Sequence, residues 1–216
     1  MYLPRHFQEN RIDVLAGVIR DHPLATLVSL AEDGLLATHL PMLWDPEPAP
    51  FGTLTGHVAR PNPHARVAAS RVDSLAIFSG PQAYVSPSWY PSKREHGKVV
   101  PTWNYIVVHA HGPLQTIDDA AWVRAFVTRL TEIQERDLID PWRIGDAPAA
   151  FIERMLAGIV GLEMPVRRFE GKWKLSQNRS DADVAGTIEG LDARADPGAT
   201  AVAGAMRVSH GGRPGA

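Results

Sequence analysis

Hydrophobic positions in the first hundred residues predict a helix followed by a series of strands. Ile12, Leu15 and Ile19 recur at helical spacing, and a His-Pro pair ends this amphipathic run. Two β-rich runs, residues 24–31 and 35–43, flank an Asp-Gly pair that is typical of a tight hairpin. Similar runs predict further strands at residues 52–59, 74–80, 83–86 and 102–112. The proline-rich segment at residues 45–50 predicts a loop.

The second half of the chain switches to helical periodicity before it returns to extended structure. Asp118 is expected to cap a helix over residues 120–136, and Asp146 with Pro148 to open another over residues 149–160. After these come an extended stretch at residues 159–176 and short helices at residues 183–191 and 198–206. The order of elements predicts a mainly β protein of the α+β class, with helices flanking the sheet.

The length of the chain favours one domain. A chain of 216 residues can bury roughly 70% of its unfolded surface, so it needs neither disulfides nor metal to fold. We expect a single domain at residues 1–206 and a flexible tail, rich in Gly and Pro, at residues 207–216. The absence of cysteine excludes thiol catalysis, iron–sulfur clusters and disulfide bonds.

The charge and hydropathy of the chain limit its partners. The N-terminal segment has no apolar stretch of signal-peptide length, and no window approaches the length of a membrane span. A cytoplasmic protein without a membrane partner is therefore expected. The formal net charge of −2 provides no general field that attracts nucleic acid. DNA thus stays open as a partner, but the charge pattern does not support it.

Rare residue types gather in three polar-aromatic segments, residues 56–63, 78–105 and 172–179. All four lysines lie in the second and third of these segments, beside serine, asparagine and tryptophan, although arginine is the usual cation elsewhere; they are Lys93, Lys98, Lys172 and Lys174. Compact ammonium groups next to aromatic side chains suit a phosphorylated ligand that carries a ring.

Several other kinds of site find no support. His109 and His111 share one face of a predicted strand, but carboxylates or thiolates at ligand spacing are missing beside them, so no metal site is expected. The chain lacks the glycine motifs of Rossmann and P-loop sites, and its serines lack the pattern of a hydrolase nucleophile. No catalytic residue is assigned from the sequence.

Six segments together resemble the blocks of a known family. They are MYLPRHF, THLPML, GHVARPNP, FSGPQAYVSPSWYPSK, VPTWNYIVVHAHG and KLSQNR, in this order over residues 1–206. Their pattern is similar to that of the PaiB family, described as FMN-binding negative transcriptional regulators. The resemblance implies FMN as cofactor and an antiparallel, Greek-key, FMN-binding split β-barrel like that of the pyridoxamine-phosphate oxidase superfamily. It also implies a homodimer with flavin sites at the interface. A flavin-dependent oxidoreductase acting on a small molecule is the alternative function.

The first and third segments supply candidate FMN ligands, on the strength of this resemblance. Arg60 offers a guanidinium fork for the phosphate, with Asn62 in the same segment, and His57 lies near enough to touch the phosphate or ribityl chain. Lys174 and Ser176 add a charge and a hydroxyl, while Gln177 and Asn178 offer amides to the pyrimidine edge of the flavin; these residues complete the set from the third segment. The alternative is that Arg60 caps the following turn and His57 is an ordinary satisfied polar residue.

The middle segment supplies the remaining candidates. A wall for the flavin or a substrate is expected from residues that share polar or aromatic character: Ser86, Trp89, Lys93, Trp103 and Asn104. The alternative is a proline-stiffened loop whose tryptophans cover the barrel mouth or the partner subunit. Trp103 and Asn104 open a predicted strand, so only one of the two can point into a given cavity.

Overall fold

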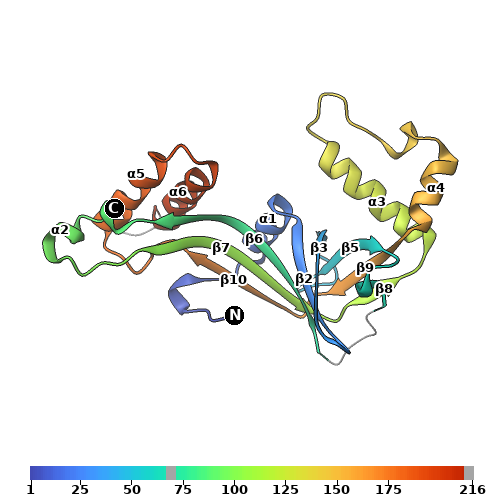
Figure 1. Ribbon diagram of the computed structural model, residues 1–216, viewed down its shortest axis with the longest axis horizontal. Helices are drawn as coiled ribbons and strands as arrows, with labels where there is room; N and C mark the ends of the chain where they lie inside the picture. Colours follow the sequence, from blue (N-terminus) through green and yellow to red (C-terminus); the bar gives the residue numbers. More distant parts are fainter. Residues whose placement is uncertain (67–71, 212–216) are drawn as a thin grey trace. The chain divides into compact units, whose positions relative to one another are not determined.

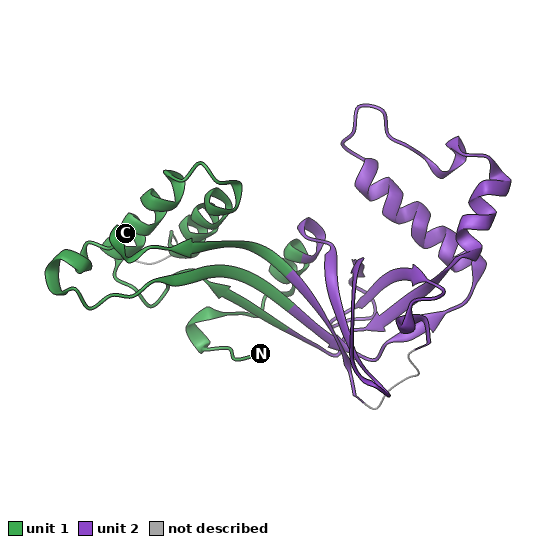
Figure 2. Ribbon diagram, viewed as in Figure 1, with its two compact units in different colours: residues 1–18, 79–108, 170–216 green, residues 19–78, 109–169 purple. Residues whose placement is uncertain are grey.

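The computed structural model describes residues 1–66 and 72–211 (Figure 1). The chain folds into two compact units: unit 1 holds residues 1–18, 79–108 and 170–216, and unit 2 holds residues 19–78 and 109–169 (Figure 2). Antiparallel sheets with flanking helices confirm the predicted α+β class. The single domain at residues 1–206 stays a prediction. No helix in the described ranges combines the length and apolar character that crossing a bilayer requires.

The helices and strands have the following bounds. The strands are β1 (Gln8–Glu9), β2 (Leu24–Ala31), β3 (Gly34–Pro41), β4 (Leu43–Asp45), β5 (Thr53–Ala59), β6 (Ser74–Val85), β7 (Thr102–Gly112), β8 (Gln115–Ile117), β9 (Ile159–Pro165) and β10 (Arg168–Lys174). The helices are α1 (Ile12–Asp21), α2 (Ser92–His96), α3 (Ala120–Glu135), α4 (Ala149–Ala157), α5 (Asp181–Asp192) and α6 (Pro197–His210).

Unit 1 is built on strands in the order β1-β10-β7-β6. Helices α5 and α6 pack together on one face, where their apolar side chains form a core with side chains from the strands; its fully buried members include Leu175, Leu191, Val202 and Met206. Strand side chains alternate between faces, so the residues next to the core residues point the other way. That other face exposes Tyr84 and Trp103, at 40% and 47% of their surface.

Unit 2 combines the β2–β3 hairpin with a four-stranded sheet of order β4-β5-β9-β8. Helices α3 and α4 share a small core of Val123, Ile152 and Leu156. Trp122 of α3 lies directly over Gly161 of β9, and a Cβ at Gly161 would overlap the indole ring. Glycine is therefore required at this close approach of helix and strand.

Several predicted elements are confirmed, and the differences have local causes. The predicted strands at 74–80 and 83–86 form one strand, β6, although Pro81 lies within it. The pairing of β6 with β2 ends at Ile77, so the missing N–H of Pro81 breaks no bond to β2. Helix α4 is shorter than the predicted 149–160, because β9 begins at Ile159, directly after the C-cap Gly158.

The predicted helix starts also need correction. Asp119, not Asp118, caps α3: its carboxylate accepts the Trp122 N–H at 2.7 Å. Asp118 is instead paired with an arginine, described below. Helix α4 has Pro148 as its N-cap without a side-chain cap. Asp146 lies in the preceding 3-10 turn, where it accepts the backbone N–H of Arg143 at 2.8 Å.

The C-terminal helix extends further than expected. Helix α6 continues to His210, so the segment 207–210 that was expected to open a flexible tail is helical. Arg207 forms an ion pair with Asp192 of α5, and the ring of His210 bonds the carbonyl of Leu175 at 2.9 Å. These contacts explain the extra turn. Residues 212–216 of the predicted tail lie outside the described residues.

Candidate functional site

The predicted ligand residues divide between the two units. His57, Arg60 and Asn62 belong to unit 2. The others belong to unit 1: Ser86, Trp89, Lys93, Trp103, Asn104, Lys174, Ser176, Gln177 and Asn178. Within each unit, the partners of these side chains decide which of them remain available to a ligand.

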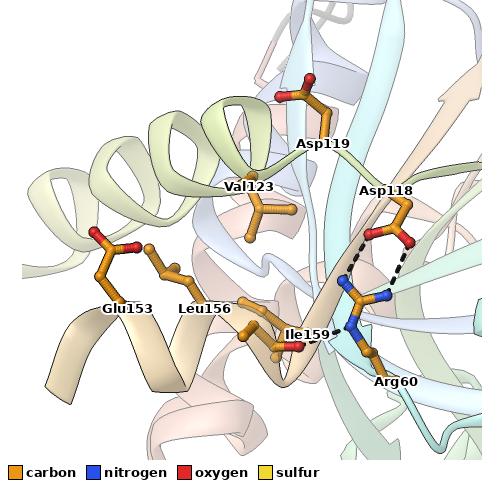
Figure 3. A pocket seen from close by; sticks show the side chains of 9 residues that line it. Arg60, Asp118, Asp119, Val123, Glu153, Leu156 and Ile159 are labelled. Atoms are coloured by element: carbon orange, nitrogen blue, oxygen red, sulfur yellow. Dashed lines mark hydrogen bonds and ion pairs between the residues drawn. The ribbon is translucent and has the colours of Figure 1, made fainter. Parts of the chain in front are cut away.

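Arg60 of unit 2 is occupied by protein partners (Figure 3). Its two terminal nitrogens donate to both carboxylate oxygens of Asp118, at 2.9 and 2.6 Å, and its Nε donates to the carbonyl of Ala157 at 2.7 Å. The latter contact places the guanidinium at the C-terminal end of α4, where a cation is favoured. The hydrogen bonds from Arg60, together with its charge, hold the pKa of Asp118 below its usual value.

The pocket beside Arg60 does not suit a phosphate. It has a volume of about 260 Å³ and an apolar floor that includes Val123, Leu156 and Ile159. Three carboxylates lie around it, from Asp118, Asp119 and Glu153 (Figure 3). A phosphate dianion here would have to displace an ion pair and then face these like charges. The phosphate role predicted for Arg60 therefore has no geometric support.

His57 and Asn62 also have structural surroundings. The ring of His57 meets Phe126 of α3 edge-on, with centroids 5.6 Å apart. Its Nδ1 is buried and has no hydrogen-bond partner among the described residues. Burial lowers the pKa of His57, which favours the neutral ring. Asn62 accepts the backbone N–H of His64 at 2.9 Å and contacts Thr38, so it stabilises the turn after β5.

His64, which the sequence did not single out as functional, is completely buried in a hydroxyl network. Its Nδ1 lies 2.7 Å from Thr38 Oγ1 and its Nε2 lies 3.2 Å from Ser29 Oγ. Ser29 is in turn bonded to Ser74 at 2.7 Å. The network joins β2, β3 and β6 to the turn, and burial lowers the pKa of His64.

These histidines predict a loss of stability in mild acid. Because the pKa of His64 and that of His57 are lowered in the folded state, the unfolded chain binds more protons once the pH falls below about 6.5. Stability is thus full above this value and falls below it, by at most about 1.4 kcal/mol per pH unit for each histidine. Urea unfolding between pH 7.5 and 5.5 should show the fall, and His64→Gln should reduce its slope. An unchanged slope in this variant would contradict the role of His64.

Asn104 and Ser176 of unit 1 form a buried pair on the helix-covered face. Asn104 has no exposed surface, and its Nδ2 donates to Ser176 Oγ at 2.9 Å and approaches Met206 Sδ at 3.5 Å. Ser176 has a positive φ of 67°, a conformation that costs energy in a residue other than glycine. The pair therefore stabilises the bend after β10 and lies in the core.

Lys174 and Gln177 organise the end of β10. The Nζ of Lys174 donates to Thr102 Oγ1 and to the carbonyl of Trp103, both at 2.6 Å. Burial lowers the pKa of Lys174, and the charges of Lys172 and Arg179 lower it further. Gln177 accepts the Leu175 N–H at 2.8 Å and donates to the carbonyl of Trp173 at 2.6 Å. Asn178 is exposed.

The loop after β6 has mostly internal contacts. Ser86 accepts the backbone N–H of Ser88 at 3.2 Å, and Lys93 donates to Ser88 Oγ at 3.1 Å. The ring of Trp89 packs against α5, so it is not available to stack on a ligand. Of the candidates in this loop, the exposed Lys93 keeps its ammonium at the surface.

Trp103 lies on the face of the unit 1 strands that is opposite α5 and α6. We call this surface the open face and define it by Gln82, Tyr84, Trp103, Tyr105, Lys172 and Lys174. The indole N–H of Trp103 donates to Gln82 Oε1 at 3.1 Å, and the ring meets Tyr84 edge-on at 6.1 Å. A groove of about 200 Å³ runs beside Trp103 and Tyr105, over Gly80. Trp103 thus points to the open face, whereas Asn104 points to the opposite face of the strand. This confirms the expectation that only one of the two can face a given cavity.

Lysines complete the open face. The Nζ of Lys172 lies over the rings of Tyr105 and Tyr2, at 5.4 and 5.6 Å, and donates to the carbonyl of Tyr2 at 3.0 Å. The ligand residues predicted from the sequence do not include Gln82, Tyr84, Tyr105 or Lys172. The usable signal was the two-residue period that puts Tyr105 on the same face as Trp103.

The sequence matches the family model described as "Putative FMN-binding domain" over residues 1–168. The chain belongs to this FMN-binding family. It is 32% identical over 206 residues to the protease synthase and sporulation protein PAI 2 of Bacillus subtilis, covering 95% of this chain and 96% of that protein. It is 30% identical to an uncharacterized protein of Emericella nidulans, covering 89% and 90% of the two chains. This confirms the predicted resemblance to the PaiB family.

Solved structures show the same fold in other flavin proteins. The FAD and heme binding protein of Mycobacterium smegmatis superposes with a TM-score of 0.59 at 16% identity, over 82% of this chain and 78% of that one. The flavocytochrome Anf3 of Azotobacter vinelandii gives a TM-score of 0.58 at 12% identity, over 85% and 78%. The fold of this FMN-binding family member is the predicted antiparallel split β-barrel.

The side chains of the open face fit the chemistry of FMN. Trp103 and Tyr105 provide flat apolar surface, and the amide of Gln82, which already accepts from Trp103, still has N–H groups to donate. Lys174 uses two of its three N–H groups on Thr102 and Trp103, which leaves one without an acceptor in the described part of the chain. Aromatic surface, an amide and an ammonium therefore meet here, whereas the Arg60 pocket is acidic.

Proposed function

We propose that this protein is a homodimeric FMN-binding protein of the PaiB type that holds the flavin against the open face of unit 1. The observation that carries the proposal is the exposed Trp103 with Lys174 at its backbone carbonyl, at a Nζ–O distance of 2.6 Å. Membership of the FMN-binding family supports the cofactor. A cytoplasmic location is part of the same proposal.

Trp103, Gln82 and Lys174 of the open face have distinct parts in this binding. Trp103, whose ring is oriented by Gln82, would stack on the flavin. Lys174 would donate its remaining N–H to an anionic oxygen of the cofactor, because its other two are bound to protein oxygens. Bound FMN supplies a ring that accepts and returns electrons. The protein side chains bind it, orient it and keep water from one side of it.

A second copy of the chain is the proposed cover of the rest of this surface. Tyr84 and Trp103 are large aromatic residues with 40% and 47% of their surface exposed, and neighbouring aromatic side chains of this kind are typical of interfaces. Light scattering and absorbance of the FMN-loaded protein should show a dimer with one flavin per chain. Dilution to monomers should release the flavin. A flavin-loaded monomer would contradict the shared site.

Negative regulation of transcription is the role we propose for this flavin dimer, from its similarity to PAI 2 and the PaiB family. The net charge of −2 favours an effect through a small molecule or a partner protein over tight, direct DNA binding. The alternative role is a flavin-dependent oxidoreductase. It is favoured by the position of Lys174 on the open face, where burial lowers the pKa of its ammonium and makes this group a better proton donor than a fully solvated lysine.

One preparation of the FMN-loaded protein separates these roles. It is titrated against its own upstream DNA and a scrambled duplex at two salt concentrations, and its flavin absorbance is followed with NADH and NADPH. Weak, nonselective DNA binding without flavin reduction supports indirect regulation. Tight, sequence-selective binding supports direct repression. Rapid flavin reduction with turnover of an acceptor supports the enzyme.

A further inference from the structure

Helix α5 contacts the loop of residues 86–98, which we call the 86–98 loop, through a notch of two glycines. Gly186 and Gly190 lie one turn apart on α5. A Cβ at Gly190 would overlap the indole ring of Trp89, and a Cβ at Gly186 would overlap the backbone oxygen of Trp89. Trp89 therefore approaches the helix backbone more closely than any side chain on α5 would permit.

A buried carboxylate makes the second contact between α5 and the loop. Asp183 is only 4% exposed. It accepts the backbone N–H of Ser92 at 3.1 Å and the Ser92 hydroxyl at 2.7 Å. Buried, charge-assisted hydrogen bonds of this kind are among the stronger ones in proteins. They attach the start of α2, within the loop, to the first turn of α5.

The ring of Tyr90 provides a third contact from the segment just before α5. Tyr90 is 2% exposed, and the guanidinium of Arg179 lies 4.9 Å from the centre of its ring. Trp89, Tyr90 and Ser92 are thus all held, whereas residues 93–98 of the loop are exposed. Without these contacts, the loop would keep the backbone entropy of an open segment.

The contacts come from a part of the chain that the family model does not cover. The match to the FMN-binding domain ends at residue 168, and α5 begins at Asp181. The loop that α5 holds carries Lys93 and Ser88, whose Nζ and Oγ lie 3.1 Å apart. An ammonium beside a hydroxyl is suited to an anionic ligand.

We propose that α5 is a positioning element for the cofactor site: Asp183, Gly186 and Gly190 hold the 86–98 loop. This loop leads from the end of β6, which carries Tyr84, toward the start of β7, which carries Trp103, so a fixed loop keeps this end of the open face in the shape that binds FMN. This inference rests on the proposed FMN site and adds residues that do not touch the cofactor. An open loop must close before FMN binds, so the apparent affinity is the affinity of the closed form multiplied by the fraction of molecules in which the loop is closed.

Two glycine substitutions in helices form a matched test. Gly190→Ala places a methyl group in the Trp89 ring, while Gly204→Ala of α6 adds one where no atom lies within 4 Å. The overpacking caused by Gly190→Ala should lower the fraction of molecules in which the loop is closed. It should therefore also lower the FMN affinity, by about 5- to 100-fold. Gly204→Ala should leave both unchanged and should raise helix stability slightly. Hydrogen exchange of the backbone amides of residues 86–98 measures how often the loop opens, and a fluorescence titration measures the FMN affinity.

A double-mutant cycle separates positioning from general damage. In a Trp89→Leu background the ring is gone, so Gly190→Ala should have little further effect on loop exchange or FMN affinity. Asp183→Asn, which keeps the shape of the side chain, serves if Gly190→Ala does not fold. It should also speed exchange in the loop and weaken FMN binding.

The outcomes are distinct. Faster loop exchange with weaker FMN binding, at an unchanged far-UV spectrum, supports the proposal. Unchanged exchange in a folded Gly190→Ala protein overturns it, and so does faster exchange with unchanged FMN affinity. If the unmodified protein binds no FMN at all, the proposed function fails, and loop exchange alone still decides whether α5 holds the loop.

Discussion

Replacing Asn104 with alanine is expected to lower the free energy of unfolding by about 2–4 kcal/mol, whereas the same change at Trp103 should lower it by only about 1 kcal/mol. Asn104 is fully buried, and its amide bonds Ser176 and contacts Met206. Its loss leaves the buried Ser176 hydroxyl without this partner and opens a cavity. Trp103 is 47% exposed and lies on the open face.

The same two substitutions should affect FMN affinity in the opposite order, with the larger loss at Trp103. Trp103→Ala removes the proposed flavin wall and should weaken FMN binding clearly, while Asn104→Ala should change FMN binding little in protein that is still folded. Urea unfolding and a fluorescence titration on the same samples measure both quantities. A stable Asn104→Ala protein that fails to bind FMN would place Asn104 at the ligand and contradict the assignment of faces.

Substitution of Lys174 by methionine is expected to lower FMN affinity about 10- to 150-fold. This change removes the ammonium but keeps most of the side-chain length. A hydrogen bond to a charged group contributes roughly 1.5–3 kcal/mol, which corresponds to that range of affinity. Riboflavin lacks the phosphate, so its affinity should change much less. The gap between FMN and riboflavin should therefore shrink in the variant.

Arg60→Ala is the control for this prediction. Arg60 already donates to both oxygens of Asp118 and to the carbonyl of Ala157, so its loss should leave the FMN-to-riboflavin ratio unchanged. Isothermal titration with both flavins measures the ratio for each protein. If Arg60→Ala removes the preference for FMN and Lys174→Met retains it, the phosphate belongs with Arg60, and the open face loses its proposed cofactor.

The sequence was most informative where the signal is local in the chain. The helical spacing of Ile12, Leu15 and Ile19 correctly predicted α1, and the Asp-Gly pair correctly predicted the β2–β3 hairpin. Both are decided by residues within a few positions of one another. The motif blocks likewise identified the family, because they lie in order along the chain and need no knowledge of spatial contacts.

Local signals were less reliable at element ends. Asp118 and Asp119 are equally good caps by residue type, and Asp119 is the one that caps α3. Asp118 was unavailable because it pairs with Arg60, which is distant in sequence. A single strand likewise replaced two predicted ones at β6, since the effect of Pro81 depends on which neighbour needs its N–H.

Membership of the FMN-binding family, most of the element order and the alternation of Trp103 with Asn104 were thus determined by sequence alone. Only the tertiary structure decided which of these two residues is buried, which cation keeps a free N–H, and that Trp89 packs into the glycine notch of α5. The physical reason is the same in each case. Burial, ion pairing and close packing depend on partners far away in the chain, and residue type specifies what a side chain can do but not what it meets.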